Sequence, residues 1–328
     1  MALSEEFVAE HINAWQHRFS NEYFEYKKKW PSRIFRHDPL ENIAEVLRSR
    51  RLLSRSSSSD ARVLDCAPEE IVNRTNRAHD CTRFYFRPRT PTQYHVEGIR
   101  KVDEYYHGAH IPMIGMMIFD ARQILTSPDV SFSTCNMQRD DVLIGHDEDF
   151  FANNMDFENI YHTGGIGGDY SIISKRCAEV LLGSPLKVDG ILQHIYCRSD
   201  AERQTLIHLL GDDYPDWSNK IIVSDDMKVF ERKYAYVESV KISSDGLVIQ
   251  IAPRDDNQPV KIRATVRENS KNGRQVLDFS QNQFMPREGD VRRWRIPYSF
   301  SEGEFWVQIK LEDCLAFKDV IYHDDIPF

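Results

Sequence analysis

The sequence predicts an α+β domain followed by a β-sandwich, and three observations lead to this fold class. Up to residue 232, stretches with helical spacing of apolar residues are interspersed with short apolar runs typical of buried strands. After residue 232, short segments alternate apolar and polar residues and are separated by turn signals such as Asn272-Gly273. The length of 328 residues favours two domains. We therefore expect one domain over residues 1–232 and a second over 233–328.

In the first part of the chain, aromatic and aliphatic side chains recur every three to five positions and predict a helix over residues 4–30. A second amphipathic segment predicts a helix at about 39–50, and the serine-rich residues 54–59 indicate a loop. The aromatic run 82–86, bounded by prolines, predicts a strand that leads into a turn. The apolar run 111–119 predicts a buried strand.

The middle of the chain carries a glycine cluster over residues 164–168. The GxGxxG spacing and the preceding apolar strand of a phosphate loop are absent, so we expect either a flexible loop that a ligand can approach closely or a plain turn. Helical spacing follows over 171–182, then a strand over 191–197 and a helix over 200–211. The six or seven short strands that follow predict an immunoglobulin-like sandwich, which is either a partner-binding module or purely structural.

Composition excludes several classes of protein. Charged residues make up 28% and hydrophobic residues 41%, which excludes a disordered chain, and no apolar run approaches the roughly 18 residues of a membrane span. The acidic start of the chain lacks the features of a secretory signal, and the six cysteines form no CxxC pair. His107 and His110 stand without further ligands, so we expect no metal site. These features favour a cytoplasmic protein without a membrane partner.

Charge is distributed unevenly along the chain, whose formal net charge is −9. This net charge alone argues against a polyanionic partner, because nucleic-acid affinity comes largely from neutralised phosphates. However, residues 33–101 carry 14 Lys and Arg against 9 Asp and Glu, whereas residues 139–232 carry 9 against 18. A basic surface can therefore exist locally, since the local field decides what binds a cleft. Ordinary solvated faces would account for the same counts.

Two segments carry candidate chemistry. Arg74 and Arg77 precede the run Arg83 to Arg89, in which guanidinium groups alternate with aromatic rings. Guanidinium groups can bind a pyrophosphate, and the rings can stack on a nicotinamide or a splayed base. An edge strand with solvent-facing arginines is the alternative. Glu179 borders an apolar stripe after the glycine cluster, so it is either a partly desolvated carboxylate aimed at a cleft or a solvated residue on a helix.

Four further stretches have a characteristic order and spacing: Asn42 to Leu47 with Leu52 to Arg55, Phe84 to Pro91 with Tyr94, Val130 to Ser133 with Asn136 and Asp156-Phe157, and Lys175 to Leu181. Together they resemble the DarT-type ADP-ribosyltransferases, which use NAD to modify bases of single-stranded nucleic acid. The resemblance spans roughly residues 33–211. It implies an ADP-ribosyltransferase fold, a split antiparallel β core with flanking helices, and NAD as the substrate that donates ADP-ribose.

The resemblance also implies roles for individual residues. Glu179, on a helix behind a substrate-recognition loop, would stabilise the oxocarbenium-like ribose left by nicotinamide. Arg74 would be the catalytic arginine, with Arg77 as the other register. The family's histidine-aromatic-threonine motif reads Ile34 to Asp38 here, so either Arg36 or His37 would contact the nicotinamide ribose.

The implied binding residues fall into two sets. The residues expected to bind NAD are Arg36, His37, Asn42, Arg55, Arg77, Tyr85 and Arg89. The residues expected to bind the acceptor base are Tyr161, His162, Gly165, Gly167 and Tyr170, with Tyr170 as a stacking platform.

The resemblance implies transfer of ADP-ribose to a base of single-stranded DNA or RNA by a toxin that an antitoxin restrains, with phage defence as implied biology. Two alternatives stay open. The altered motif at residues 36–38 favours a binding module that has kept the scaffold without turnover. An ADP-ribosyltransferase that acts on protein is the other alternative.

Overall fold

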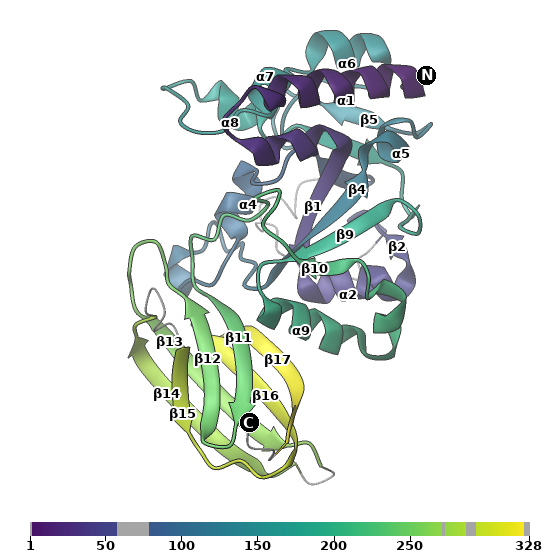
Figure 1. The fold of residues 1–328 in the computed structure, drawn as a ribbon. Helices are drawn as coiled ribbons and strands as arrows, with labels where there is room; N and C mark the ends of the chain where they lie inside the picture. Colours follow the sequence, from purple (N-terminus) through teal and green to yellow (C-terminus); the bar gives the residue numbers. More distant parts are fainter. Residues whose placement is uncertain (1, 58–78, 271–272, 287–292, 325–328) are drawn as a thin grey trace.

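The computed structural model describes residues 2–57, 79–270, 273–286 and 293–324, which form a mixed α+β part and a separate pair of sheets (Figure 1). In the first part, one eight-stranded sheet has the order β10-β9-β4-β1-β3-β7-β5-β6. Its strands are β1 Arg33–Pro39, β3 Thr82–Tyr85, β4 Ile114–Asp120, β5 Ser131–Ser133, β6 Ile144–Gly145, β7 Glu179–Leu182, β9 Leu192–Cys197 and β10 Ile221–Val223. The pair β9 and β10 is parallel, and the other described pairs of this sheet are antiparallel.

Short helices surround this sheet. The α-helices are α1 Glu5–Ser20, α2 Leu40–Ser49, α4 Pro91–Val96, α5 Ala121–Leu125, α6 Glu148–Asn154, α7 Phe157–Ile160, α8 Ser171–Lys175 and α9 Asp200–Leu210. The 3-10 segments are η1 Glu25–Ser32, η3 Val102–Glu104 and η4 Gly211–Trp217, and a small two-stranded sheet pairs β2 Arg51–Leu52 with β8 Leu186–Lys187. None of the helices in the described ranges is long and apolar enough to cross a membrane.

The first expected helix is shorter than its apolar spacing predicts. The Ser4 side chain accepts a hydrogen bond from the backbone N–H of Phe7 and caps α1, which ends at Ser20. The aromatic spacing continues into η1, where Trp30 is fully buried and donates from Nε1 to the carbonyl of Met227 at 3.0 Å. A spacing of three to five therefore also fits a 3-10 segment that follows a helix. The expected helices at 39–50 and 200–211, and the expected strands at 82–86, 111–119 and 191–197, are confirmed within a few residues.

Close packing of α2 on the sheet requires glycine at one position. A Cβ atom on Gly115 in β4 would lie 2.5 Å from Cδ1 of Ile43 in α2. Ile43 is fully buried, together with Leu40 at the start of the same helix. The side chain missing at Gly115 therefore lets α2 approach β4 and close one face of the core.

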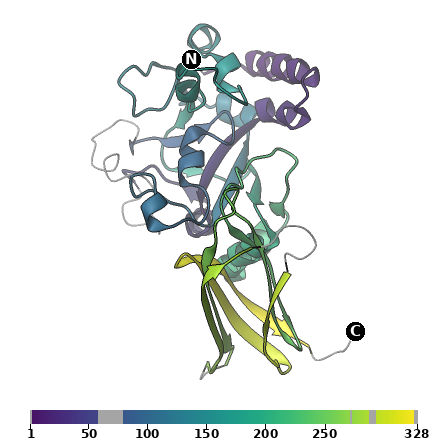
Figure 2. The same ribbon diagram turned by 90° about the vertical axis from the view of Figure 1, so that its left-hand side faces the viewer.

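The C-terminal part consists of two sheets around a shared core, as Figure 2 shows from the side. The strands are β11 Tyr236–Ser243, β12 Gly246–Ala252, β13 Val260–Glu268, β14 Gln275–Phe284, β15 Arg293–Pro297, β16 Gly303–Leu311 and β17 Cys314–His323. The sheets have the orders β11-β12-β15 and β14-β13-β16-β17. Val237, Ile249 and Val266 are among the fully buried residues that both sheets contribute. The alternating pattern thus predicted these strands correctly, and the immunoglobulin-like character of the sandwich stays a prediction.

Helix α9 belongs to the first part but also packs on the sandwich. The Ser199 hydroxyl, at its N-cap, donates to the carbonyl of Val237 in β11 at 2.7 Å. The Thr205 hydroxyl accepts from the backbone N–H of Lys318 in β17 at 3.1 Å. Ala201 is buried within the hydrophobic cluster of the sandwich. The expected boundary at residue 232 stays a prediction, because these contacts tie the two parts together.

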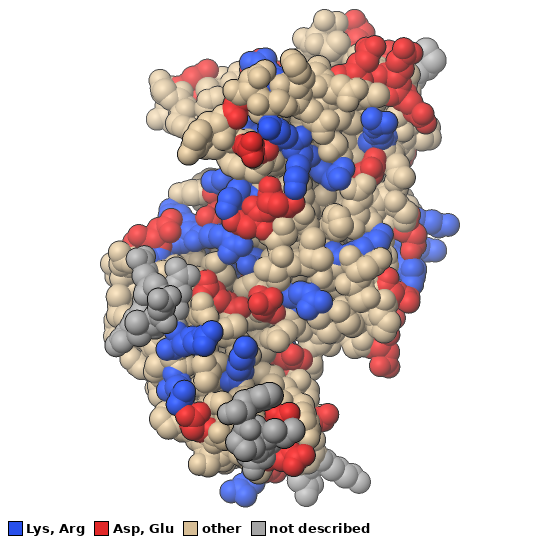
Figure 3. All heavy atoms as spheres, in the orientation of Figure 1, with Lys and Arg blue, Asp and Glu red and all other residues tan. Residues whose placement is uncertain are grey.

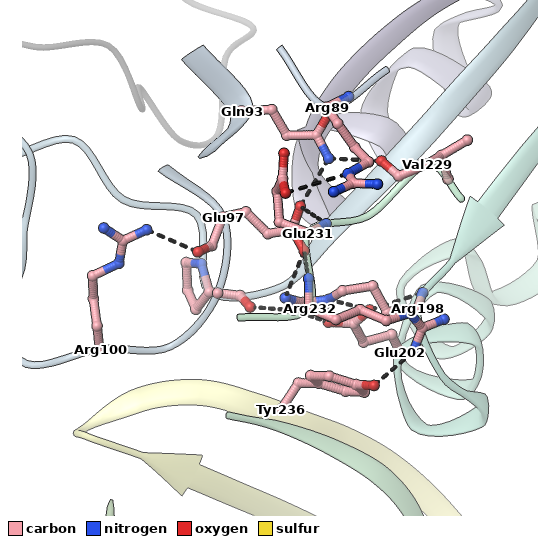
Figure 4. A network of polar contacts seen from close by, with 12 residues as sticks. Arg89, Gln93, Glu97, Arg100, Arg198, Glu202, Val229, Glu231, Arg232 and Tyr236 are labelled. Carbon is pink, nitrogen blue, oxygen red and sulfur yellow. Dashed lines mark hydrogen bonds and ion pairs between the residues drawn. The ribbon is translucent and has the colours of Figure 1, made fainter. Parts of the chain in front are cut away.

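A buried polar network lies where the chain passes between the two parts (Figure 4). The Glu97 carboxylate accepts from the backbone N–H groups of Glu231 and Arg232 at 3.1 and 3.0 Å and from Nε2 of Gln93 at 2.8 Å. Arg198 lies 3.7 Å from Glu97 and donates from Nε to Glu202 at 3.0 Å. Since these charged side chains are at least 98% buried, they depend on one another for compensation.

We expect Arg198→Ala to lower the free energy of unfolding by about 3–5 kcal/mol, because the buried carboxylates of Glu97 and Glu202 lose their cation. Chemical denaturation followed by circular dichroism measures this loss. Arg263→Ala removes a mostly exposed ion pair with Asp278 and should leave the unfolding midpoint nearly unchanged. Equal effects of the two substitutions would show that burial of the network does not matter to stability.

Candidate active site

A row of four residues crosses the middle of the eight-stranded sheet. Phe35 on β1 lies opposite Tyr85 on β3, and Tyr85 lies opposite Glu179 on β7. Ser133 on β5 lies on the other side of Glu179. Directly opposed residues of neighbouring antiparallel strands project from the same face of a sheet. The strand order therefore brings Tyr85, Glu179 and Ser133 together from distant parts of the sequence.

Glu179 is the first residue of β7, which corrects the expectation that it lies on a helix over residues 171–182. The helix α8 ends at Lys175, and all four residues of β7 are buried. A short apolar run is compatible with either a buried strand or a helical segment. The pairing of β7 with both β3 and β5 decides between the two, and the spacing of residues within one segment does not contain that information.

Arg83, two residues before Tyr85 on β3, binds both oxygens of the Glu179 carboxylate. Its Nε donates to Oε2 at 2.5 Å and its Nη2 donates to Oε1 at 2.6 Å. The backbone N–H of Met137 also donates to Oε1, at 3.3 Å. Glu179 is 0% exposed, and burial of a charged carboxylate is costly unless the charge is paired. The ion pair with Arg83 compensates this cost. Burial alone would lower the pKa of Arg83, but the adjacent carboxylate raises this pKa above its ordinary value, so the guanidinium stays charged.

The backbone of Glu179 is held from the other neighbouring strand. Its N–H donates to the Ser133 hydroxyl at 3.1 Å, and that hydroxyl donates to the carbonyl of Cys135 at 2.7 Å. Ser133 is fully buried. Both the main chain and the carboxylate of Glu179 are therefore fixed by hydrogen bonds to side chains or backbone of the flanking strands.

Tyr85 and His37 form a parallel pair of rings beside Glu179. Their ring centroids lie 5.7 Å apart and their planes differ by 5°. Burial, together with the charge on Glu179, raises the pKa of Tyr85 to about 12, and burial lowers the pKa of His37 to about 4. The Thr92 hydroxyl donates to the Tyr85 hydroxyl at 3.3 Å. Near neutral pH both rings are uncharged and form an aromatic surface next to a carboxylate.

Arg36 and Asn42, two residues of the expected NAD-binding set, are both directed to Asp38. Arg36 donates to Oδ2 of Asp38 from Nε at 3.0 Å and from Nη2 at 2.7 Å, and Asn42 donates to Oδ1 at 3.0 Å. Nη1 of Arg36 donates to the carbonyl of Arg83 at 2.9 Å. Arg36 thus links β1 to the strand that carries Arg83, whereas its neighbour His37 lies against Tyr85.

The other predicted arginines are Arg55, Arg74, Arg77 and Arg89. Arg74 and Arg77 fall outside the described residues, so their roles stay predictions. Arg55 lies in the turn after β2. Arg89 adopts a left-handed backbone conformation, with φ of 55°, and its Nε donates to the Glu231 carboxylate at 3.3 Å. Burial raises the pKa of Glu231, although Arg89 opposes this effect.

The expected acceptor loop begins in the core and becomes exposed along its length. Tyr161 is only 2% exposed and packs edge-on against Trp15 and Phe19. Its ring is therefore not available to an acceptor base, contrary to the expectation, because it anchors the loop to the N-terminal helix. Tyr170, by contrast, is 75% exposed. Gly165 and Gly167 are exposed between these two residues, and Gly167 has a φ of 57° that a larger side chain would rarely adopt.

His162 lies between two arginines at the base of this loop. Arg87 donates to its carbonyl, and Nη2 of Arg176 lies 2.5 Å from its Nδ1. Burial, together with the neighbouring charges of Arg176 and Arg89, lowers the pKa of Arg87 to about 9. The charges of Arg176 and Arg89 thus disfavour the charged form of Arg87, so an anion bound beside Arg87 would be stabilised. Figure 3 shows Lys and Arg side chains beside an indentation between the α7–α8 segment and the region of α4.

The two residues that hold Glu179 were not expected beside it, since Arg83 was grouped with the arginines that could bind a pyrophosphate. Arg83 and Ser133 stood within recognised segments, but neither was connected to the glutamate. The signal for Arg83 was present, because a residue two positions before Tyr85 on a strand projects from the same face. Ser133 carried no such signal, since its role depends on the pairing of β5 with β7. In the part of the chain that the structure describes, no group of three or more His, Cys, Asp or Glu side chains is arranged to hold a metal ion.

Comparisons with known proteins find similarity over the part of the chain that contains Tyr85 and Glu179. A family model described as "ssDNA thymidine ADP-ribosyltransferase, DarT" matches residues 35–229, more than half of the chain. DarT from Thermus sp. 2.9, solved in complex with ADP-ribosylated ssDNA, is 19% identical with a TM-score of 0.50, over 60% of this chain and 96% of that chain. The complex of the same protein with carba-NAD+ gives 18% identity and a TM-score of 0.48, over 60% and 97%.

Thermosipho africanus DarTG in complex with ADP-ribose is 14% identical with a TM-score of 0.43, over 66% of this chain and 55% of that chain. Comparison with curated proteins finds no match. At 19% identity, the likeness to the Thermus protein bears on the fold alone, and it confirms the expected ADP-ribosyltransferase core.

We expect proton uptake by His37 to destabilise the protein as the pH falls. The pKa of His37 is lowered by burial from 6.5 to about 4, so between these values the unfolded chain binds a proton that the folded protein does not. The free energy of unfolding should therefore fall as the pH is lowered from 6.5 towards 4, and less steeply in His37→Gln. Denaturation at a series of pH values measures the slope, and an imidazole of His37 that titrates near 6.5 by NMR would contradict this assignment.

Proposed function

Because the chain belongs to the DarT family of ADP-ribosyltransferases, we propose that it transfers ADP-ribose from NAD to a base of single-stranded DNA. One observation carries the proposal: the Glu179 carboxylate, fully buried, is fixed by Arg83 opposite Tyr85, whose ring stacks on that of His37. A carboxylate buried at this energetic cost, next to uncharged aromatic rings, is suited to a cationic reaction centre.

The proposed chemistry begins with departure of nicotinamide. The bond between C1′ of the ribose and the pyridinium nitrogen breaks, nicotinamide leaves with the bonding electrons, and positive charge develops on the ribose. The Glu179 carboxylate stabilises that charge. A nitrogen of the acceptor base then attacks C1′, and the proton that this nitrogen loses passes to the carboxylate or to water. The parallel Tyr85 and His37 rings form the surface on which nicotinamide stacks.

The diphosphate of NAD has a basic partner in the same region. The charges of Arg176 and Arg89 disfavour the charged form of Arg87, and an anion bound beside Arg87 would offset this effect. Of the expected NAD-binding set, His37, Tyr85 and Arg89 fit this placement. Arg36 and Asn42 act instead through Asp38, because their polar groups are already engaged there.

The acceptor is the base of a single strand that enters over the exposed end of the acceptor loop. Tyr170, at 75% exposure, supplies a stacking face. The family model's description favours DNA, and RNA of the same sequence is the competing acceptor to test. A toxin role with an antitoxin partner, a cytoplasmic location and a role in phage defence are further proposals that the family resemblance supports.

A binding module without turnover is the second candidate. The engagement of Arg36 with Asp38, at the position where the family has its first NAD-binding motif, favours it. Labelled NAD separates the two candidates, because a module without turnover binds single strands but transfers no label.

We expect Glu179→Gln to lower transfer of label from NAD to single-stranded DNA by about 10²–10⁴-fold, because the uncharged amide no longer stabilises the ribose cation. Glutamine is preferred to alanine, since alanine would leave Arg83 without a partner. The readout is labelled oligodeoxynucleotide, with RNA and total protein as parallel acceptors, and the second readout is relief of growth arrest in a bacterial host. A folded variant that transfers label at the wild-type rate contradicts the role of Glu179.

Arg83 acts through Glu179, as a positioning residue, and two substitutions test this role. Arg83→Gln removes the charge that compensates the buried carboxylate, so we expect kcat to fall about 100-fold and the acid limb of the pH profile to move to higher pH. Arg83→Lys keeps the charge but not the bidentate geometry. Its kcat should therefore lie between those of the wild type and Arg83→Gln, with an acid limb close to that of the wild type. Identical pH profiles in all three proteins would mean that Arg83 has a structural role only.

A further inference from the structure

A cluster of aromatic side chains lies on the surface next to the site. Tyr94 and His95 stand on α4, and Tyr106 and His107 follow η3; with Lys233 we call these five residues the α4 surface. Tyr94 and Tyr106 are 42% and 43% exposed. The rings of His95 and Tyr106 stack at 4.0 Å with an interplanar angle of 17°, and Tyr94 meets His95 edge-on at 5.6 Å.

The α4 surface combines these rings with a single cation at its edge. Lys233 donates from Nζ to the Tyr94 hydroxyl at 2.7 Å and lies 4.8 Å from the centre of that ring. Burial, together with the charges of Arg100, His107 and Lys233, lowers the pKa of His95, so its ring is neutral near pH 7. The rings therefore present uncharged faces of the kind on which bases stack.

The charges around the α4 surface nearly balance. The buried Arg254 is paired with the carboxylates of Glu104, in η3, and Asp256. Lys101 and Asp103 are both exposed at the start of η3. A ligand held here is consequently bound more by stacking than by neutralised phosphates, and its affinity should depend only weakly on salt.

The α4 surface is connected directly to the candidate active site. Thr92, one turn before the end of α4, donates to the Tyr85 hydroxyl, and the helix begins one residue after Thr90, its N-cap. Six residues of helix span about 9 Å, so a strand whose target base reaches the ribose of an NAD bound at Tyr85 passes within reach of Tyr94. Figure 2 shows the α4 segment on the side of the molecule that faces the viewer, between the upper helices and the sandwich.

We propose that the α4 surface binds single-stranded DNA outside the target base, by stacking unpaired bases on Tyr94 and Tyr106. This inference rests on the proposed function and extends it from one base to the neighbouring nucleotides. Lys233 lies beyond residue 229, where the family match ends, so this part of the binding surface is contributed by the segment that leads into the sandwich.

The test uses the full chain and the double variant Tyr94→Leu/Tyr106→Leu, which keeps apolar bulk but removes the stacking faces. Fluorescence anisotropy measures binding of a labelled 20-nucleotide single strand, of the same strand with abasic sites at all but one position, and of a matched duplex. We expect the affinity of the double variant for the complete strand to be lower by about tenfold or more. The affinity of the wild type for the abasic strand should be lower by a similar factor. Tyr322→Leu, a 58% exposed tyrosine on β17, is the matched control and should bind as the wild type does.

Transfer of ADP-ribose supplies the second readout. In the wild type, KM should be lower for a 20-nucleotide acceptor than for a 5-nucleotide acceptor, and in the double variant the ratio of the two KM values should approach one. If the double variant keeps the wild-type ratio and binds the complete strand as tightly, the α4 surface is not part of the strand path. If no acceptor takes label while the difference in binding persists, the proposed function fails and the binding surface stands.

Discussion

The fold of this protein depends on the charge pair between Arg83 and Glu179. A carboxylate that is 0% exposed in the middle of a sheet cannot be tolerated alone, and a cation that binds both of its oxygens compensates the loss of water. The two residues lie on neighbouring strands that are 96 positions apart in sequence. The pairing of β3 with β7 therefore both stabilises the sheet and orients the carboxylate.

The sequence allowed the fold class and most of the strands to be predicted, because periodicity and residue type are local properties. The role of Glu179 was implied by the family resemblance and stays a prediction. The sequence did not allow the surroundings of Glu179 to be predicted, since these arise from strand order. The error over residues 171–182 illustrates the difference, because the same apolar spacing suits a helix and a strand buried on both faces. Tyr161 is a second example, because it was expected to bind the acceptor base, whereas the packing of the N-terminal helix encloses its ring.

The contacts made by residues 231 and 232, at the end of the expected first domain, were also beyond prediction. The backbone N–H groups of Glu231 and Arg232 satisfy the Glu97 carboxylate, and the Glu231 side chain accepts from Arg89. Arg89 thereby belongs both to the turn beside the site and to the junction of the two parts. Alternating strand patterns identify a sandwich. They contain no information about which carboxylate of the first domain the segment before the sandwich will contact.

The same junction bears on how the protein is made. Domains fold broadly in the order in which they leave the ribosome. Glu97 acquires its backbone donors, and Arg89 its carboxylate, only after residues 231 and 232 have emerged. A nascent chain that already contains Glu179 thus still lacks the contacts that brace the neighbouring turn. The turn beside the site is therefore braced only after the chain has been made well beyond Glu179, as far as residue 232.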